Sequence, residues 1–209
     1  ETGRIFRINW TSTAWYRTEN YFNSAAWRGT WSGEGGGLLI NQCIHDLDIW
    51  HYLFGMPQRL RAFCRFGKHH DIEVEDEASV FMDYADGATG IFVAGTGESP
   101  GTNRLEIACS RGKIVVENKT ISFHRTSVPL EVFTKTDTKG FCEPEHWVCD
   151  IPTFGQADLS GGMLRNFVDA VLEGAPLLVN GVEGIVSLEL ENAILLSTWI
   201  DNWVKLPVD

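Results

Sequence analysis

The stretch GEGGGLLINQCIHDLDIWHYLFG, residues 33–55, places a run of glycines before an apolar segment that also contains asparagine, histidine and aspartate. From Leu38 to Phe54 the apolar residues recur at the three- and four-residue spacing of one helical face, which predicts a helix. Gly55 and Pro57 end the pattern, as is usual at a helix C-terminus. The function of the chain depends on whether the glycines bind phosphate and on what the histidine does.

The glycines do not form a known nucleotide-binding motif. A phosphate loop needs a lysine and a hydroxyl residue after its last glycine, whereas Gly37 is followed by Leu38 and Leu39. A dinucleotide fingerprint needs GxGxxG directly after a strand, and the segment before Gly33 is irregular and aromatic. Two interpretations stay open: the glycines let the backbone approach a ligand closely, or they form a tight entry into the helix.

The rest of the chain predicts a sheet and two closing helices. Arg4–Trp10 has the composition of a strand, and after the helix the pattern changes to period two. About six strands joined mostly by tight turns are then expected, at residues 60–66, 78–84, 88–94, 104–109, 113–117 and 120–125. Helices are expected at 162–173 and 181–203, the second with Asn180 and Glu183 as a capping box. The predicted fold is α+β, with an open, mostly antiparallel sheet and helices packed on one face, in one domain spanning residues 1–209.

Two segments lack a regular pattern. Residues 11–36 are polar and aromatic, and their length is typical of a functional or lid-like loop. Residues 134–160 are expected to extend over the surface. The chain also begins inside a strand pattern, from which we expect that a part N-terminal to it is missing.

Composition excludes several classes of function. Asp and Glu total 28 against 17 Lys and Arg, a net charge of −11 without a basic patch, so no nucleic-acid partner is expected. The chain has no apolar run long enough for a membrane span and no signal-peptide layout at its start. The 5 cysteines are odd in number and irregularly spaced, which indicates reduced thiols in a cytoplasmic protein.

The histidine of the opening stretch has polar neighbours at helical spacing. Asn41, His45 and Asp48 form a polar stripe on the predicted helix. A histidine oriented by an amide or a carboxylate is suited to general acid–base catalysis, and a buried core histidine is the alternative interpretation. A metal site is not expected, because His45 and His51 would diverge by about 240° around the helix.

Three segments together resemble a known family: WRGTWSGEGGGLLINQCIHDLDIWHYLFGMP at 27–57, VEDEASVFMDYADGATGIFVAGTGES at 74–99, and NRLEIACSRGKIVVE at 103–117. They are similar to the C-terminal domain of Gfo/Idh/MocA oxidoreductases, and GGG-L-L-I-N-x-x-I-H-D-L-D is the most specific part. The resemblance runs from about Trp10 to the final helix. It implies that the open sheet supplies the substrate pocket and often the oligomer interface. It also implies an N-terminal Rossmann domain, absent from this chain, that binds NAD or NADP.

The resemblance further implies roles for single residues. His45 matches the histidine taken as general acid/base in the family, where a lysine of the first domain assists it. Four residues earlier many members have Asp, whereas this chain has Asn41, which orients the substrate or the imidazole but cannot ionise. Gly35, Gly36 and Gly37 would let the nicotinamide approach. The aromatic segment is a candidate wall of the substrate pocket, where its side chains would stack on a sugar ring and bind hydroxyl or carboxylate groups. The alternative is that these side chains only pack under the loop. The candidate residues are Trp15, Arg17, Trp27 and Arg28.

The resulting hypothesis is the substrate-binding and catalytic domain of a cytoplasmic NAD(P)-dependent oxidoreductase that acts on a sugar, inositol or similar polyol. The fragment alone is expected to be inactive, and a homodimer or homotetramer is expected through the open sheet face. Three alternatives remain: a non-catalytic sugar-binding or assembly module, an NAD-dependent glycosidase, and a metal-dependent hydrolase that uses His45 and Asp48.

Overall fold

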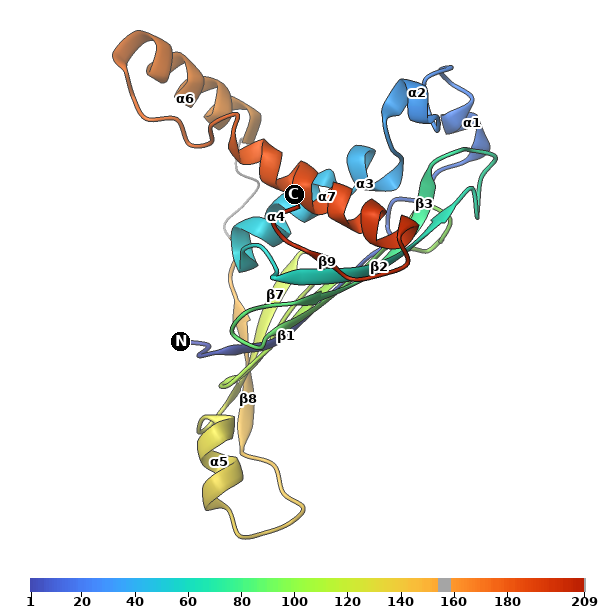
Figure 1. Cartoon of the computed structure of the whole chain (residues 1–209). Helices are drawn as coiled ribbons and strands as arrows, with labels where there is room; N and C mark the ends of the chain where they lie inside the picture. The colour runs from blue at the N-terminus through green and yellow to red at the C-terminus, as the bar shows by residue number, and fades with distance from the viewer. Residues whose placement is uncertain (154–158, 209) are drawn as a thin grey trace.

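A nine-stranded sheet carries helices on one of its faces in the computed structural model, which describes residues 1–153 and 159–208 (Figure 1). Within these residues the strand order is β8-β7-β6-β5-β1-β4-β3-β2-β9. The neighbours pair antiparallel except β1 and β4, which pair in parallel. The predicted α+β class, with an open and mostly antiparallel sheet, is confirmed.

The elements have the following bounds. The strands are β1 Ile5–Ser12, β2 Arg59–Phe66, β3 Glu75–Asp83, β4 Thr89–Gly95, β5 Asn103–Cys109, β6 Gly112–Glu117, β7 Thr120–Thr126, β8 His146–Ile151 and β9 Val204–Lys205. The helices are α1 Glu19–Phe22, α2 Trp31–Glu34, α3 Leu38–Asn41, α4 Ile44–Phe54, α5 Leu130–Thr136, α6 Leu159–Glu173 and α7 Glu183–Trp199. The seven strands expected from the sequence are all present, within a few residues of the expected ends.

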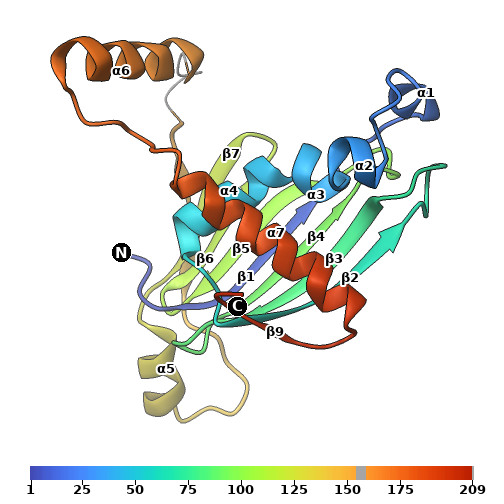
Figure 2. The same ribbon diagram turned by 45° about the horizontal axis from the view of Figure 1, so that its top comes forward.

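The core lies between the sheet and the two helices α4 and α7, which cross its inner face (Figure 2). Trp50 of α4 is fully buried and stacks on Trp10 of β1, with ring centroids 6.4 Å apart. The ring of Phe92 from β4 meets Trp50 edge-on at 5.9 Å. Truncating a buried aromatic side chain of this kind costs about 3–5 kcal/mol. This packing holds α4 firmly against the strands.

The helix predicted at residues 38–54 is divided, so the prediction of one continuous helix was wrong. α3 ends at Asn41 and α4 begins at Ile44, and the N–H of Cys43 donates to the carbonyl of Leu38 at 2.8 Å. This bond spans five residues instead of four, which inserts an extra residue into the turn, as in a π-bulge. The spacing of apolar residues does not reveal such an insertion, because both halves bury the same side. His45 therefore follows Asn41 across a break.

The irregular segments contain more structure than expected. Residues 11–36 include the short helices α1 and α2. Within the segment 134–160, the structure has the end of α5 and all of β8, while residues 154–158 lie outside the described residues. β8 pairs with β7 at the sheet edge, but most of its side chains are exposed. An edge strand with little burial lacks the alternation by which strands are recognised.

The two closing helices differ in burial. Leu190 and Ile194 of α7 are fully buried on the sheet, whereas α6 extends away from it in Figures 1 and 2. The exposed apolar side chains of α6 are Met163, Leu164, Phe167, Val168, Val171 and Leu172. The predicted contacts of Asn180 with Glu183 are present, since Oδ1 of Asn180 accepts the N–H of Glu183 at 3.3 Å and the N–H of Asn180 donates to Oε1 of Glu183 at 3.5 Å. The helix itself begins later than expected, at Glu183 with Val182 as its N-cap. Among the described residues, no helix is both long and apolar enough to cross a membrane.

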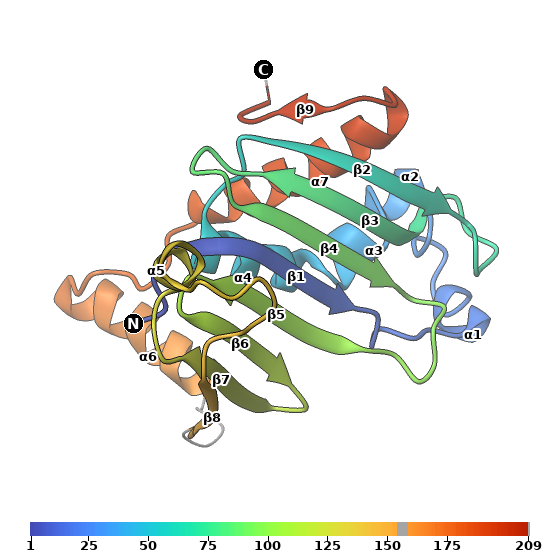
Figure 3. The same cartoon turned by 90° about the horizontal axis from the view of Figure 1, so that it is seen from below.

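The opposite face of the sheet is seen from below in Figure 3, where α4 and α7 lie behind the strands. Phe63 and Phe81 are exposed hydrophobic residues of β2 and β3. The ring of Phe81 packs edge-on against Trp203 at 5.9 Å. Further along the sheet, Arg104 forms ion pairs with Glu117 at 2.6 Å and with Glu106, two residues away, at 3.3 Å. This open face therefore combines an aromatic patch with paired charges.

Candidate active site

The buried carboxylate of Glu75 fixes the glycine turn by accepting hydrogen bonds from its backbone. Oε1 of Glu75, in β3, accepts the N–H groups of Gly37 and Leu39, both at 2.9 Å. These N–H groups belong to the start of α3 and have no partner within the helix, so a carboxylate there stabilises it. A Cβ atom on Gly37 would lie 2.3 Å from the backbone oxygen of Glu75, so packing within the protein already requires glycine at this position.

The other two glycines of the turn have different surroundings. Gly36 is buried, and a Cβ there would lie 3.2 Å from Oε1 of Glu191. Gly35 is exposed and has φ +81°, a left-handed conformation that favours glycine. The tight-entry interpretation therefore accounts for the glycines by packing and conformation. Contact of Gly35, Gly36 and Gly37 with the nicotinamide stays a prediction.

A second buried carboxylate, Glu191 of α7, lies near the same turn. Burial raises the pKa of Glu191 to about 7, and the charge of Glu75 also raises it. Burial likewise raises the pKa of Glu75, while the N–H groups of Leu39 and Gly37 oppose this rise. Sequence reasoning missed both residues, because a glutamate in a helix or strand is usually solvated.

The amide of Asn41 lies at the centre of a polar network. Its Nδ2 donates to Oε1 of Glu34, and its Oδ1 accepts from Nε2 of Gln42 at 3.0 Å. The hydroxyl of Tyr21 contacts the same Oδ1 at 3.4 Å. Glu34 also accepts the N–H of Gly29 at 2.8 Å through its other oxygen. Glu34 was not among the residues predicted for the site, but the structure places its carboxylate against Asn41.

Tyr21 brings together the two arginines that the sequence singled out. Its hydroxyl accepts from Nη1 of Arg28 at 2.5 Å and from Nε2 of Gln42 at 3.2 Å. The guanidinium carbons of Arg17 and Arg28 lie 5.0 and 4.3 Å from the centre of the Tyr21 ring, within cation–π range. Sequence reasoning missed Tyr21 and Gln42. Their signal was weak, since each is a single polar residue in an irregular or apolar segment.

The two tryptophans proposed as pocket wall are held differently. Nε1 of Trp15 donates to Ser12 at 3.0 Å and to Asp46 at 3.1 Å, and its ring packs against the core. Trp27 is exposed, and the guanidinium carbon of Arg28 lies 4.4 Å from the centre of its ring. Trp15 thus has the packing role that the sequence left as an alternative, whereas Trp27 presents its ring at the surface.

His45 lies in the first turn of α4 and is exposed. Its ring forms no hydrogen bond with any residue that the structure describes. The buried-core interpretation of His45 is therefore excluded. The adjacent carboxylate of Asp46 is buried instead and accepts the hydroxyl of Ser12 at 2.7 Å. Asp48 accepts the hydroxyl of Ser187 at 2.9 Å, so it acts as a link to α7.

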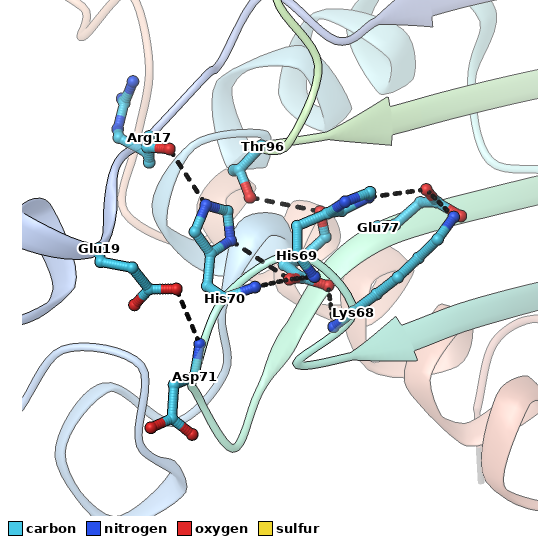
Figure 4. Close-up of polar contacts among 9 residues, drawn as sticks. Arg17, Glu19, Lys68, His69, His70, Asp71, Glu77 and Thr96 are labelled. Carbon is cyan, nitrogen blue, oxygen red and sulfur yellow. Dashed lines mark hydrogen bonds and ion pairs between the residues drawn. The ribbon is translucent and has the colours of Figure 1, made fainter.

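The irregular segment of residues 11–36, called the aromatic loop below, is bonded to the turn between β2 and β3, as Figure 4 shows. His70 is buried there, with Nδ1 3.2 Å from Oδ2 of Asp76 and Nε2 3.1 Å from the carbonyl oxygen of Arg17. Asp76 also accepts the backbone N–H groups of Lys68, His69 and His70. Oε1 of Glu19 accepts the N–H of Asp71 at 3.1 Å. These bonds fix the loop that carries Arg17 beside the candidate site.

The structure gives no support for a metal centre in the part of the chain that it describes. There, no three His, Cys, Asp or Glu side chains are grouped so as to hold a metal ion. All of the cysteines, Cys43, Cys64, Cys109, Cys142 and Cys149, are free thiols. Burial, followed by the charge of Asp46, raises the pKa of Cys43, which is therefore a neutral thiol next to α4.

Comparison with known proteins assigns a family to this fold. The family model described as GFO/IDH/MocA C-terminal domain matches residues 1–115, more than half of the chain. The chain therefore belongs to the GFO/IDH/MocA family, as the resemblance of its motifs implied. A search among curated proteins found no match.

Solved structures of dehydrogenases have the same fold. The WlbA dehydrogenase of Chromobacterium violaceum, in complex with NADH and UDP-GlcNAcA, is 26% identical with a TM-score of 0.77, over 100% of this chain and 56% of that one. The WlbA dehydrogenase of Bordetella pertussis is 22% identical with a TM-score of 0.76, over 100% and 56%. A levoglucosan dehydrogenase in complex with NADH and levoglucosan is 19% identical with a TM-score of 0.74, over 99% and 60%.

These neighbours define a class of protein. Each was crystallised with NADH, consistent with a nicotinamide cofactor for the family, and each is a dehydrogenase. The chain is thus a domain of oxidoreductase type. It spans 56–60% of the length of these three relatives.

Proposed function

We propose that the chain is the substrate-binding and catalytic domain of an NAD(P)-dependent oxidoreductase that acts on a sugar, inositol or similar polyol. The observation that carries the proposal is the exposed imidazole of His45, four residues after an asparagine whose amide is set in a polar network. An exposed histidine that bonds to none of the described residues suits proton exchange with a substrate hydroxyl. In this role His45 is the general acid/base and Asn41 orients the hydroxyl.

Substrate binding is assigned to the aromatic loop. In both Arg17 and Arg28 the Nε atom is buried and has no hydrogen-bond partner among the described residues. Buried donors are normally satisfied, so these guanidinium groups suit a hydroxyl or carboxylate group of a ligand. Trp27 provides an exposed ring that stacks on a sugar, and Trp15 supports the loop from below. The ligands of two neighbours, UDP-GlcNAcA and levoglucosan, support a carbohydrate substrate.

The cofactor is assigned mainly to a Rossmann domain outside this chain, because the chain contains no nucleotide-binding motif. The residues present fit contact with a nicotinamide held there, since Gly35 and His45 are both exposed. When bound, NAD or NADP accepts the hydride from the substrate carbon. Within this chain, His45 takes the hydroxyl proton, Asn41 fixes the hydroxyl, and the loop holds the sugar.

The test is a panel of sugars and inositols with both cofactors, using the full-length protein and following the absorbance of the reduced nicotinamide. The proposal predicts oxidation of at least one substrate, and neither turnover nor tight NAD(P) binding by residues 1–209 alone. Sugar binding without turnover would support the non-catalytic module instead. Bond cleavage without net reduction of the cofactor would support a glycosidase.

Assembly through the open sheet face is the second part of the proposal. Phe63, Phe81 and Trp203 give this face an exposed aromatic patch, and such patches commonly meet a partner. We propose a homodimer or homotetramer in the cytoplasm, where the free cysteines stay reduced. Light scattering of the full-length protein should give a mass of two or four chains, and Phe81→Glu should reduce it to one.

A further inference from the structure

Glu34 occupies the point at which the aromatic loop meets the end of α3. Through Oε2 it accepts the N–H of Gly29, which belongs to the loop. Through Oε1 it accepts Nδ2 of Asn41, the last residue of α3. Its carboxylate has no ion pair with a basic side chain in the residues described. An unneutralised charge therefore lies directly against the amide that the proposed mechanism uses.

We propose that Glu34 is a positioning residue for catalysis, which fixes and polarises the amide of Asn41. The inference rests on the proposed function, because it concerns a residue that acts on the substrate only through Asn41. Nothing in the sequence pattern selects Glu34 for this role. It precedes the glycine turn and lies seven residues before Asn41, and only the turn brings the two side chains together.

The first effect is on the direction of the amide. An asparagine side chain can be rotated to exchange its oxygen and nitrogen. Glu34 only accepts hydrogen bonds, so it selects the orientation in which Nδ2 faces it. Oδ1 then faces Gln42 and Tyr21, which both donate to it. Asn41 therefore presents its oxygen, as an acceptor, to the side of the network where Tyr21 and the arginines lie.

The second effect is on the strength of that acceptor. A chain of hydrogen bonds polarises its members, and a bond to an ionised group is roughly twice as strong as a neutral one. With Glu34 behind it, Oδ1 of Asn41 carries more negative charge than an isolated amide oxygen. Oδ1 accepts from Gln42 at 3.0 Å and from Tyr21 only at 3.4 Å, so a substrate hydroxyl bonds to this oxygen in place of the Tyr21 hydroxyl. Toward that hydroxyl the pair Glu34–Asn41 acts more like a carboxylate than Asn41 alone.

Glu73 is a nearby carboxylate that stabilises the loop without contacting the proposed catalytic residues. Oε2 of Glu73 accepts the N–H of Trp31 at 3.2 Å and does not touch Asn41. Glu73 and Glu34 are both carboxylates that bond to backbone N–H groups of the same loop. Glu73→Gln is therefore the matched control for Glu34→Gln.

The experiment is steady-state kinetics of the full-length protein with the best substrate of the panel, on Glu34→Gln, Asn41→Asp and the double variant. Glu34→Gln loses the charge and keeps one of the two acceptor oxygens, so its amide bonds either Gly29 or Asn41 but not both. The kcat should therefore fall about tenfold with KM within about twofold. Asn41→Asp alone sets two carboxylates against each other, so its kcat should also fall. The double variant restores one carboxylate beside one amide, and its kcat should recover to within about threefold of wild type.

Controls separate the outcomes. Glu73→Gln should keep the wild-type kcat, and the unfolding midpoint of each variant shows that it is folded. Unchanged kcat in Glu34→Gln, or a double variant that loses the product of the two single effects, would overturn the positioning role while the proposed function stands. Absence of turnover by the wild type on every substrate would defeat the proposed function first, and this inference with it.

Discussion

Two regions that contain a histidine differ in how fully their polar groups are satisfied. At the turn between β2 and β3, His70 is only 8% exposed, and its ring nitrogens lie against Asp76 and the carbonyl of Arg17. At the start of α4, His45 is exposed and bonds to none of the described residues. A histidine with complete contacts holds structure, whereas one with open contacts is free to act on a ligand. We therefore expect substitutions around His70 to change mainly the stability of the fold, and substitution of His45 to change mainly the activity.

The largest effect on stability is expected for Asp76→Ala. The carboxylate is fully buried and accepts three backbone N–H groups besides facing His70. Its removal leaves the N–H of His70 buried without this partner, frees the partly buried N–H groups of Lys68 and His69, and breaks the contact with the His70 ring. The free energy of unfolding should therefore fall by about 3–5 kcal/mol. Urea denaturation measures the loss. Asp71→Ala, at an exposed aspartate of the same turn, is the control and should change stability by less than about 0.5 kcal/mol.

His70→Ala should have the next largest effect, about 1–3 kcal/mol by the same measurement. The substitution removes the contacts with Asp76 and Arg17 and the packing of the ring on Phe22, whose centre lies 4.7 Å away. His45→Ala should leave the unfolding midpoint within experimental error. Equal destabilisation by the two substitutions would remove the distinction between the regions.

Stability should also depend on pH through Glu191. Its pKa is about 7 in the fold against an ordinary value of 4.5, so the folded chain holds this proton more tightly than the unfolded chain. The corresponding stability is complete below about pH 4.5 and is lost as the pH rises through 7. Glu191→Gln should therefore raise the free energy of unfolding above pH 7 by on the order of 1–2 kcal/mol. Parallel curves of stability against pH for the two proteins would contradict the buried, protonated state.

The smallest effect is expected for Tyr21→Phe in the full-length protein. The change removes a hydroxyl that contacts Arg28, Gln42 and Asn41 and keeps the ring in cation–π range of the guanidinium groups of Arg17 and Arg28. Loss of these neutral and charged hydrogen bonds should raise KM about 2- to 10-fold with little change in kcat. A change confined to kcat would place Tyr21 in the chemical step instead of in substrate binding.

The sheet was predictable from the sequence because its inner strands are half-buried. In β3, Ala78, Val80 and Met82 are buried in alternation, and this alternation is visible in the sequence. β8 and β9 were missed, since one is mostly exposed and the other has only 2 residues. The break at Gln42 and Cys43 was missed for a different reason, because it preserves the apolar side of the helix.

The candidate site was predictable only in part. Asn41 and His45 stood out by their spacing, whereas Arg17 and Arg28 became candidates only through the family resemblance. Glu34, Tyr21 and Gln42 were not predicted, because their contacts depend on how the loop folds back onto α3. Long-range contacts of this kind leave no periodic trace in a single sequence.

Turnover by the His45→Ala variant of the full-length protein tests the central claim most directly. General acid–base catalysis typically contributes a factor of 10²–10⁴, so kcat should fall by about that amount while the unfolding midpoint stays at the wild-type value. A kcat within about twofold of wild type, in a variant that is fully folded, would contradict the assignment of His45 as the general acid/base.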